Sequence, residues 1–348
     1  MLSRVVSSLY WMSRYVERAE NTARLVDVNL QLMLDASNLD DSAIAGYWAP
    51  ILESTGDQEL FAKLYPKLSG HTATEFLVFQ LENANSILSS ITQARENART
   101  VRDQITSELW EELNRLYLFL NSPRARDMWR QSPFEFFQEI KTSSLLLQGL
   151  TAATVMRNEG WYFTQVGRYL ERADKTSRIL DVRHATLVPG YVATQTDALG
   201  WSAVLFSCSA WDGYKALHGG QVEPRLVAEF LLFSEDFPRS VRFCVQQLNT
   251  ALRHISGVAE GSFSNDAERH CGRLLAELQF STADEVLAHG LHDYIDAIQS
   301  KLNTIGEAMF QTYIFQHFSP QQEDEIRQQE EQQQQQRNTK PGHSSDSS

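Results

Sequence analysis

Apolar residues recur at steps of three and four along most of this chain, within stretches that contain neither Pro nor Gly. The first such stretch runs from Leu2 to about Ala36, and its spacing predicts one long helix with a single buried face. Small residues at Ala19 and Ala23 on that face would let another helix approach closely. The recurring positions of this stretch are Met12, Tyr15, Ala19, Val26, Leu30 and Met33.

The helical pattern continues to about residue 318. Only the run from Glu75 to Phe79 could be a strand by its periodicity, and its one candidate partner is a similar run at 229–233. We therefore predict an all-α protein, a helical bundle. The expected helices are a segment through Trp48 and Leu52 closed by Gly56, a piece ending at Leu64, the Glu75–Phe79 run, Ala84–Leu120, Phe134–Leu150, Gly160–Leu187 with a break at Pro189-Gly190, Trp201–His218, the Phe230 run, Pro238–Ile255, Asn265–Phe280 and Ala283–Phe318.

Two segments of the chain are close copies of each other. Residues 14–28 return as residues 168–182, 154 positions later, with nine of 15 residues identical. An internal repeat indicates that one structural unit is used twice. We predict two tandem homologous repeats, residues 1–155 and 156–318, each opened by a helix with a Glu-Arg pair. The same offset relates Glu75–Phe79 to Glu229–Phe233, Ser86-Ile87 to Ser240-Val241, and Arg99 to Arg253.

The composition changes after Ser319-Pro320 to Gln, Glu, Ser and Asn, with Ile326 as the one large apolar residue. Such a segment cannot bury enough apolar area to offset the entropy lost on ordering. Residues 319–348 are therefore predicted to be a disordered tail, either dispensable or an arm that binds a partner.

Charge and cysteine content narrow the class of protein. The formal net charge of −13 and the pI near 5.2 disfavour binding to nucleic acid or an anionic membrane, which needs a basic face. The three cysteines lie far apart, which argues against a disulfide scaffold and favours a reducing, cytoplasmic setting. No uncharged apolar run reaches about 18 residues, and Arg14 and Glu17 interrupt the apolar start, so neither a membrane span nor a secretion signal is expected.

The two Glu-Arg helices keep the same charged residue at five positions. No Arg of one copy is Lys in the other, which indicates that the planar guanidinium binds carboxylates bidentately. Three interpretations are open: a solvated face whose ion pairs are worth about 0.2–0.5 kcal/mol each, a buried brace between helices, or a binding or catalytic site. The retained positions are Arg14/Arg168, Glu17/Glu171, Arg18/Arg172, Arg24/Arg178 and Asp27/Asp181.

A second concentration of arginines, which includes Arg95 and Arg239, could bind a phosphate or carboxylate. We expect these arginines instead to form ion pairs with the acidic residues of the Glu-Arg helix. His289, His292 and Asp296 lie at metal-compatible steps on one expected helix, without a fourth ligand. No Gly-rich phosphate loop is present. We predict neither a metal nor a cofactor. The second concentration comprises Arg95, Glu96, Asn97, Arg99 and Arg102, with Arg239 and Arg242 at a comparable place in the second repeat.

Four segments together resemble the alpha-E family of bacterial all-helical proteins, which is defined by a Glu-Arg motif. The resemblance covers about residues 1–318, and implies an association with circularly permuted ATP-grasp ligases and transglutaminase-like peptidases. It implies a setting in which an amide or peptide is formed or processed, and it carries over no catalytic residue. The four segments are 14–28, Arg95–Arg102, Gly167–Asp174 and Phe237–Val241.

We expect an accessory or substrate-handling component of an ATP-grasp ligase system that binds a partner or a small anionic ligand through its Glu/Arg clusters. One alternative is a structural helical adaptor with buried ion-pair braces. Another is an enzyme that uses Glu17 or Glu171 as acid/base beside arginines. We expect one Glu-Arg copy to be structural and the other to face a ligand, because only the first repeat has the Arg95–Arg102 segment.

Overall fold

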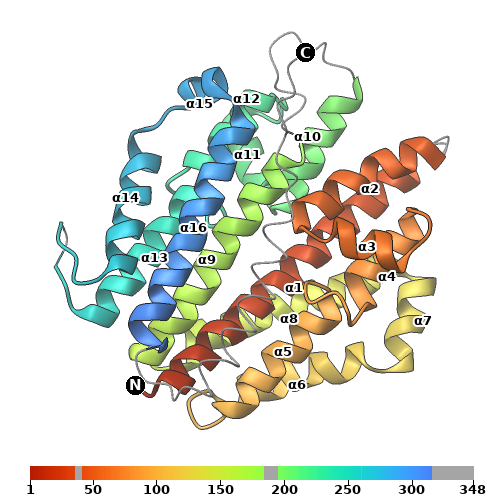
Figure 1. Ribbon diagram of the computed structural model, residues 1–348. Helices are drawn as coiled ribbons and strands as arrows, with labels where there is room; N and C mark the ends of the chain where they lie inside the picture. Colours follow the sequence, from red (N-terminus) through yellow and green to blue (C-terminus); the bar gives the residue numbers. More distant parts are fainter. Residues whose placement is uncertain (36–40, 184–194, 260, 316–348) are drawn as a thin grey trace.

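The computed structural model describes residues 1–35, 41–183, 195–259 and 261–315, and every regular element within them is a helix (Figure 1). The all-α prediction is confirmed. The helices are α1 (Ser3–Asp35), α2 (Asp41–Thr55), α3 (Gln58–Leu64), α4 (Gly70–Phe79), α5 (Ile87–Thr100), α6 (Ser107–Leu120), α7 (Pro123–Gln131), α8 (Pro133–Thr154), α9 (Glu159–Asp181), α10 (Gln195–Ser207), α11 (Trp211–His218), α12 (Pro224–Phe233), α13 (Val241–Ser256), α14 (Asp266–Phe280), α15 (Ala283–His289) and α16 (Leu291–Tyr313).

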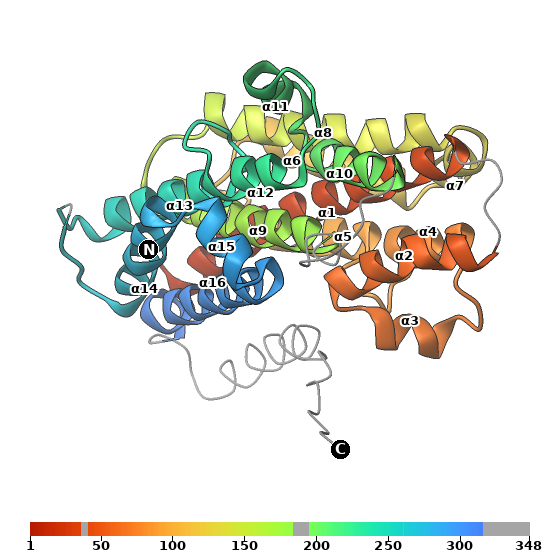
Figure 2. The same cartoon turned by 90° about the horizontal axis from the view of Figure 1, so that it is seen from above.

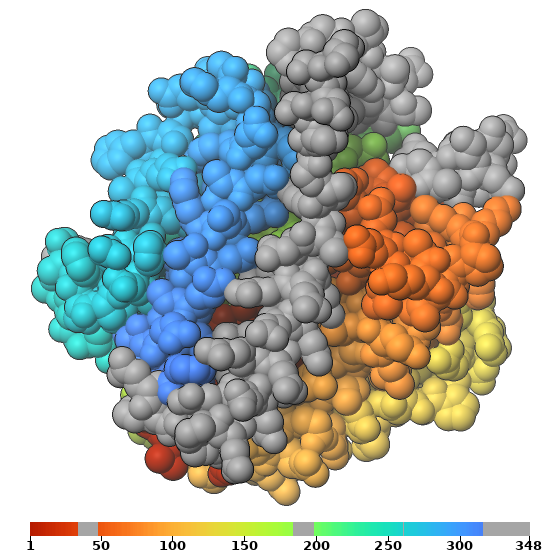
Figure 3. All heavy atoms as spheres, in the orientation of Figure 1, coloured from red at the N-terminus to blue at the C-terminus, as the bar shows by residue number. Residues whose placement is uncertain are grey.

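The two helices that carry the Glu-Arg pairs, α1 and α9, lie against each other at the centre of the molecule (Figure 2). Helices α5 and α8 pack on α1, and α13 and α16 pack on α9. Helix α2 reaches across to α9, and α10 reaches across to α1. On the face shown in Figure 3, surfaces of α2–α5 in orange and of α14–α16 in blue lie on opposite sides. The fold thus places the two motif helices between the two halves of the chain.

Small residues permit the close contact between the central helices. Ala19 and Ala23 are fully buried on α1. On α9, a Cβ atom at Gly167 would lie 2.3 Å from the backbone oxygen of Tyr10 and 2.4 Å from Oγ of Ser13. Only a residue without a Cβ fits at this crossing.

The prediction of one long helix over Ala84–Leu120 is wrong, because the chain turns between α5 and α6, although this turn contains neither Pro nor Gly. Val101 ends α5, and its backbone oxygen accepts a hydrogen bond of 2.8 Å from the backbone nitrogen of Gln104. The side chain of Thr106 then caps α6 by accepting from the backbone nitrogen of Leu109. The turn places Arg95 and Arg99 near the end of a helix rather than in its middle.

Three more boundaries differ from the predictions. The segment Trp201–His218 forms two helices, because Ser209 between them has a φ of 51°, in the left-handed region. Gly290, with a φ of 107°, likewise separates α15 from α16. Helix α13 begins at Val241 after its N-cap Ser240, so Pro238 lies before the helix and not in its first turn.

Helix starts in the two halves partly keep the sequence offset. Gly70 of α4 and Pro224 of α12 are 154 residues apart, as are Ile87 of α5 and Val241 of α13. Homology of the halves stays a prediction. Helix α9 ends at Asp181, short of the end predicted near Leu187. Leu187 itself and the tail 319–348 lie outside the described residues. None of the described helices has both the length and the apolar run that crossing a bilayer requires.

Candidate functional site

The second glutamate of the motif, Glu171, is fully buried and bound by arginines of the first copy. Arg14 donates from Nε to Oε2 of Glu171 at 2.7 Å. Arg18 donates from Nε to Oε1 at 2.7 Å and from Nη2 to Oε2 at 3.1 Å. The Arg18 pair is bidentate, as the retained arginines predicted.

The first glutamate, Glu17, is bound in the same way, but here the arginines come from the second copy. Arg172 of the second copy donates from Nε to Oε1 at 2.7 Å and from Nη2 to Oε2 at 2.8 Å. Arg239, from the segment before α13, adds a bond of 3.1 Å to Oε1. Each motif glutamate is therefore neutralised by arginines from the other half of the chain. This is the geometry of a brace at both copies, so the two motif glutamates do not show the expected difference between a structural copy and a copy that faces a ligand.

Further pairs extend this arrangement along both helices. Glu20 accepts from Arg24 at 2.9 Å and from Arg239, and Asp174 accepts from Arg178 at 3.0 Å. Gln148 of α8 links the two motif helices, because it donates to Glu20 of α1 at 2.6 Å and accepts from Arg168 of α9 at 2.6 Å. We call the whole set the central charge cluster: Arg14, Glu17, Arg18, Glu20, Arg24, Gln148, Arg168, Glu171, Arg172, Asp174, Lys175, Arg178 and Arg239.

The two motif glutamates are strongly acidic. Burial alone would raise the pKa of Glu17, but the charges of Arg172 and Arg239 outweigh it and lower the pKa to about 2. Burial is likewise outweighed at Glu171, where Arg18 and Arg14 hold the pKa well below its ordinary value. Efficient general acids and bases have pKa values near the working pH. The geometry therefore disfavours an enzyme that uses these glutamates for proton transfer.

Acid is expected to destabilise the fold between about pH 4.5 and 2. The pKa of Glu17 is lower in the folded protein than its ordinary value of 4.5, so its stabilisation is fully present above pH 4.5 and is lost as the pH falls towards 2. This shift corresponds to roughly 3 kcal/mol. Circular dichroism during urea denaturation at several pH values measures the loss, and stability that stays constant down to pH 2 would contradict it.

Of the second arginine concentration, Arg239 belongs to the central charge cluster, and the part on α5 lies apart from it. Arg95 donates to Asn114 of α6 at 2.9 Å and to Glu96 at 2.6 Å, and Arg99 pairs with Glu96 near the surface. Arg102 stacks over the ring of Trp110. The expected pairing with the acids of the Glu-Arg helix is confirmed for Arg239, which binds Glu17 and Glu20. It is wrong for Arg95, Arg99 and Arg102, because the turn after α5 directs them towards α6.

The remaining candidates form peripheral pairs. Lys141 of α8 donates to Asp27 at 2.7 Å. Nδ1 of His292 lies 2.8 Å from Oδ1 of Asp181, and its Nε2 lies 3.7 Å from Oδ2 of Asp296. These three side chains could together approach a metal ion, but they already pair with one another. His289 is not part of the group, because Gly290 places it on the preceding helix.

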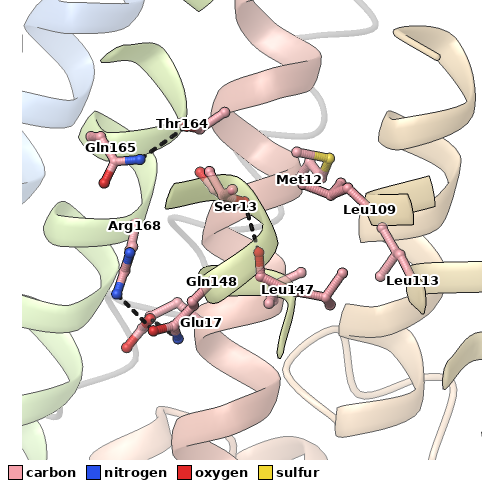
Figure 4. Close-up of a pocket in the computed structure, with 12 residues that line it drawn as sticks. Met12, Ser13, Glu17, Leu109, Leu113, Leu147, Gln148, Thr164, Gln165 and Arg168 are labelled. Atoms are coloured by element: carbon pink, nitrogen blue, oxygen red, sulfur yellow. Dashed lines mark hydrogen bonds between the residues drawn. The ribbon is translucent and has the colours of Figure 1, made fainter. Parts of the chain in front are cut away.

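A pocket opens beside the central charge cluster, between α1, α6, α8 and α9 (Figure 4). Its volume is about 460 Å³, including space open to solvent. Arg168, Gln148 and Glu17 lie at one end, and Leu109 and Leu113 lie at the other. Sequence reasoning selected Arg168 and Glu17 but missed Gln148, because α8 carries no motif that marks this residue.

Comparison with known sequences gives a family match and distant relatives. The profile of the Alpha-E family, described as "A predicted alpha-helical domain with a conserved ER motif", matches residues 1–314. Uncharacterized proteins of Mycobacterium bovis and Mycobacterium tuberculosis are each 23% identical over 338 residues. The match covers 89% of this chain and 37% of theirs, so the chain spans little more than a third of those relatives. No solved structure matches.

Proposed function

This chain belongs to the Alpha-E family, and from its central charge cluster we propose that it is an accessory, substrate-handling component of a cytoplasmic ATP-grasp amide or peptide ligase system. The supporting observation is that guanidiniums of the same chain neutralise both motif glutamates. These carboxylates are thus committed to joining two halves into one rigid body. Chemistry then falls to a partner enzyme, for which the ATP-grasp ligase and the transglutaminase-like peptidase are the candidates that the family resemblance implies.

The length of the relatives supports an accessory role. In the mycobacterial proteins, the matching region is 37% of a longer chain. A helical domain that is covalently joined to a larger polypeptide is positioned next to the rest of that polypeptide and can assist its activity. The same arrangement between separate chains requires a docking partner.

A structural adaptor is the second candidate, and the central charge cluster supports it equally well. The pocket at Arg168 distinguishes the two roles. An adaptor needs only its outer surface, whereas a substrate-handling component needs a cavity with polar groups at defined places.

Reconstitution with the ATP-grasp ligase tests the proposal. We expect the two proteins to co-elute in size-exclusion chromatography, and the ATP-dependent amide product, detected by mass spectrometry, to increase when this chain is present. ADP release by this chain alone would favour an independent enzyme instead. Neither co-elution nor any effect on product would contradict the proposal.

A further inference from the structure

The two copies of the motif arginine at the start of the repeat differ in their surroundings. Arg14 donates to Glu171 at 2.7 Å and to the hydroxyl of Tyr10 at 2.9 Å. Arg168, 154 residues later, donates from Nη2 to the amide oxygen of Gln148 at 2.6 Å, and its buried Nε has no hydrogen-bond partner among the described residues. No carboxylate in the described part of the chain forms an ion pair with Arg168.

The neighbouring side chains differ between the two copies. The rings of Tyr10 and Trp11 cover Arg14, with centroids 5.5 and 5.0 Å from its guanidinium carbon. The positions 154 residues later are Thr164 and Gln165. Both line the pocket beside Arg168. Two aromatic rings that fill this space in the first copy are thus replaced by smaller polar side chains.

The positive charges around the pocket favour an anionic ligand. Burial and the nearby charge of Arg172 lower the pKa of Arg168, and the charges of Glu17 and Glu20 offset this only in part. The central charge cluster as a whole has eight basic side chains and four carboxylates, and adding the neighbouring buried Asp57 leaves the excess positive. This excess lies within a chain whose formal net charge is −13.

The other walls of the pocket restrict the ligand further. The far end is apolar, with Met12, Leu109, Leu113 and Leu147 (Figure 4). Glu17 lies at the polar end beside Arg168, but Arg172 and Arg239 already neutralise it, so Arg168 is the cation left to balance one negative charge on a ligand. A ligand that suits both ends has one negative charge and a compact apolar body.

We propose that this pocket binds a small monocarboxylic acid, with the carboxylate on Arg168 and Gln148 and the apolar body against α6 and α8. Nε of Arg168 supplies the unused donor. Arginine suits this role because its fork of N–H donors matches a carboxylate. The site stands independently of the ligase proposal, since it rests on the pocket alone.

Ligand-observed NMR titration of the full chain with 4-methylpentanoate tests the site. Saturable binding is expected, with affinity at least about tenfold lower for 4-methylpentan-1-ol, which lacks the charge, and for inorganic phosphate, which lacks the apolar body. Equal binding of the alcohol would indicate an apolar pocket without carboxylate recognition. Tighter binding of phosphate, or binding of none of the probes, would overturn the proposal.

Two variants locate the binding. Arg168→Gln removes the charge, and Thr164→Tyr rebuilds the ring found at the first copy; each is expected to weaken 4-methylpentanoate binding at least about tenfold. Arg99→Gln, near the surface and away from the pocket, is the matched control and should bind as wild type. Circular dichroism establishes that the variants are folded. The test needs at least one of Thr164→Tyr and Arg168→Gln to be folded. If the folded variants retain wild-type affinity, the assignment is wrong.

Discussion

Glu171→Gln is expected to lower the free energy of unfolding by roughly 3–5 kcal/mol, because it leaves buried arginines without their counter-anion. Arg14 and Arg18 are 3% and 4% exposed and both bind this one carboxylate. Gln has nearly the same volume as Glu, so the loss reports on charge rather than on packing. Urea denaturation followed by circular dichroism at neutral pH gives the value.

Glu17→Gln is expected to cause a comparable loss, because Arg172 and Arg239 would lose their shared partner. Glu96→Gln is the matched control: its pairs with Arg95 and Arg99 are partly exposed, and such pairs are worth at most about 1 kcal/mol. If both motif variants are as stable as the Glu96 variant, the central charge cluster is not a brace.

Gly167→Ala is expected to lower stability by about 2–3 kcal/mol through a clash at the contact between α1 and α9. The new methyl group would meet the backbone oxygen of Tyr10 at 2.3 Å. A backbone atom cannot rotate away as a flexible side chain does, so the two helices must separate. Thermal unfolding measures the effect.

Gly149→Ala is the matched control on the neighbouring helix α8. A Cβ at Gly149 would meet nothing within 4 Å, so only the helix preference of Ala over Gly should operate. That preference stabilises by about 0.5–1 kcal/mol. The two substitutions should therefore shift the melting temperature in opposite directions. A shift of the same sign would show that α1 and α9 are not closely packed at Gly167.

Helices that begin at Pro, such as α8 and α12, could be predicted from the sequence, because this residue acts on the backbone locally, although α7, which also begins at Pro, was not among the expected helices. The turn after α5 could not, because it depends on local hydrogen bonds at Val101 and Thr106 in a segment with ordinary helix formers. Gly290 was visible in the sequence. The apolar spacing continues across it from Leu287 to Leu291, and this spacing predicts one helix where the structure has two.

The candidate charges could be selected from the sequence, but their partners could not. The identity of Arg18 with Arg172, and of Glu17 with Glu171, marked these residues as unlike a solvated face. Spacing along a helix indicates pairs within that helix, such as Glu20 and Arg24, which are four residues apart and bond to each other. It contains no information on which residue of a second helix lies opposite. That depends on the angle and register at which α1 meets α9.

The reciprocal pairing has the form of an isologous contact, in which one residue touches a second and the equivalent of the second touches the equivalent of the first. Glu17 binds Arg172 while Glu171 binds Arg18, as across the twofold axis of a homodimer. In a true homodimer, every substitution appears at both equivalent places. A single chain removes that restriction. In this chain Arg14 is covered by aromatic rings, while Arg168, its equivalent in the sequence, lies beside a pocket.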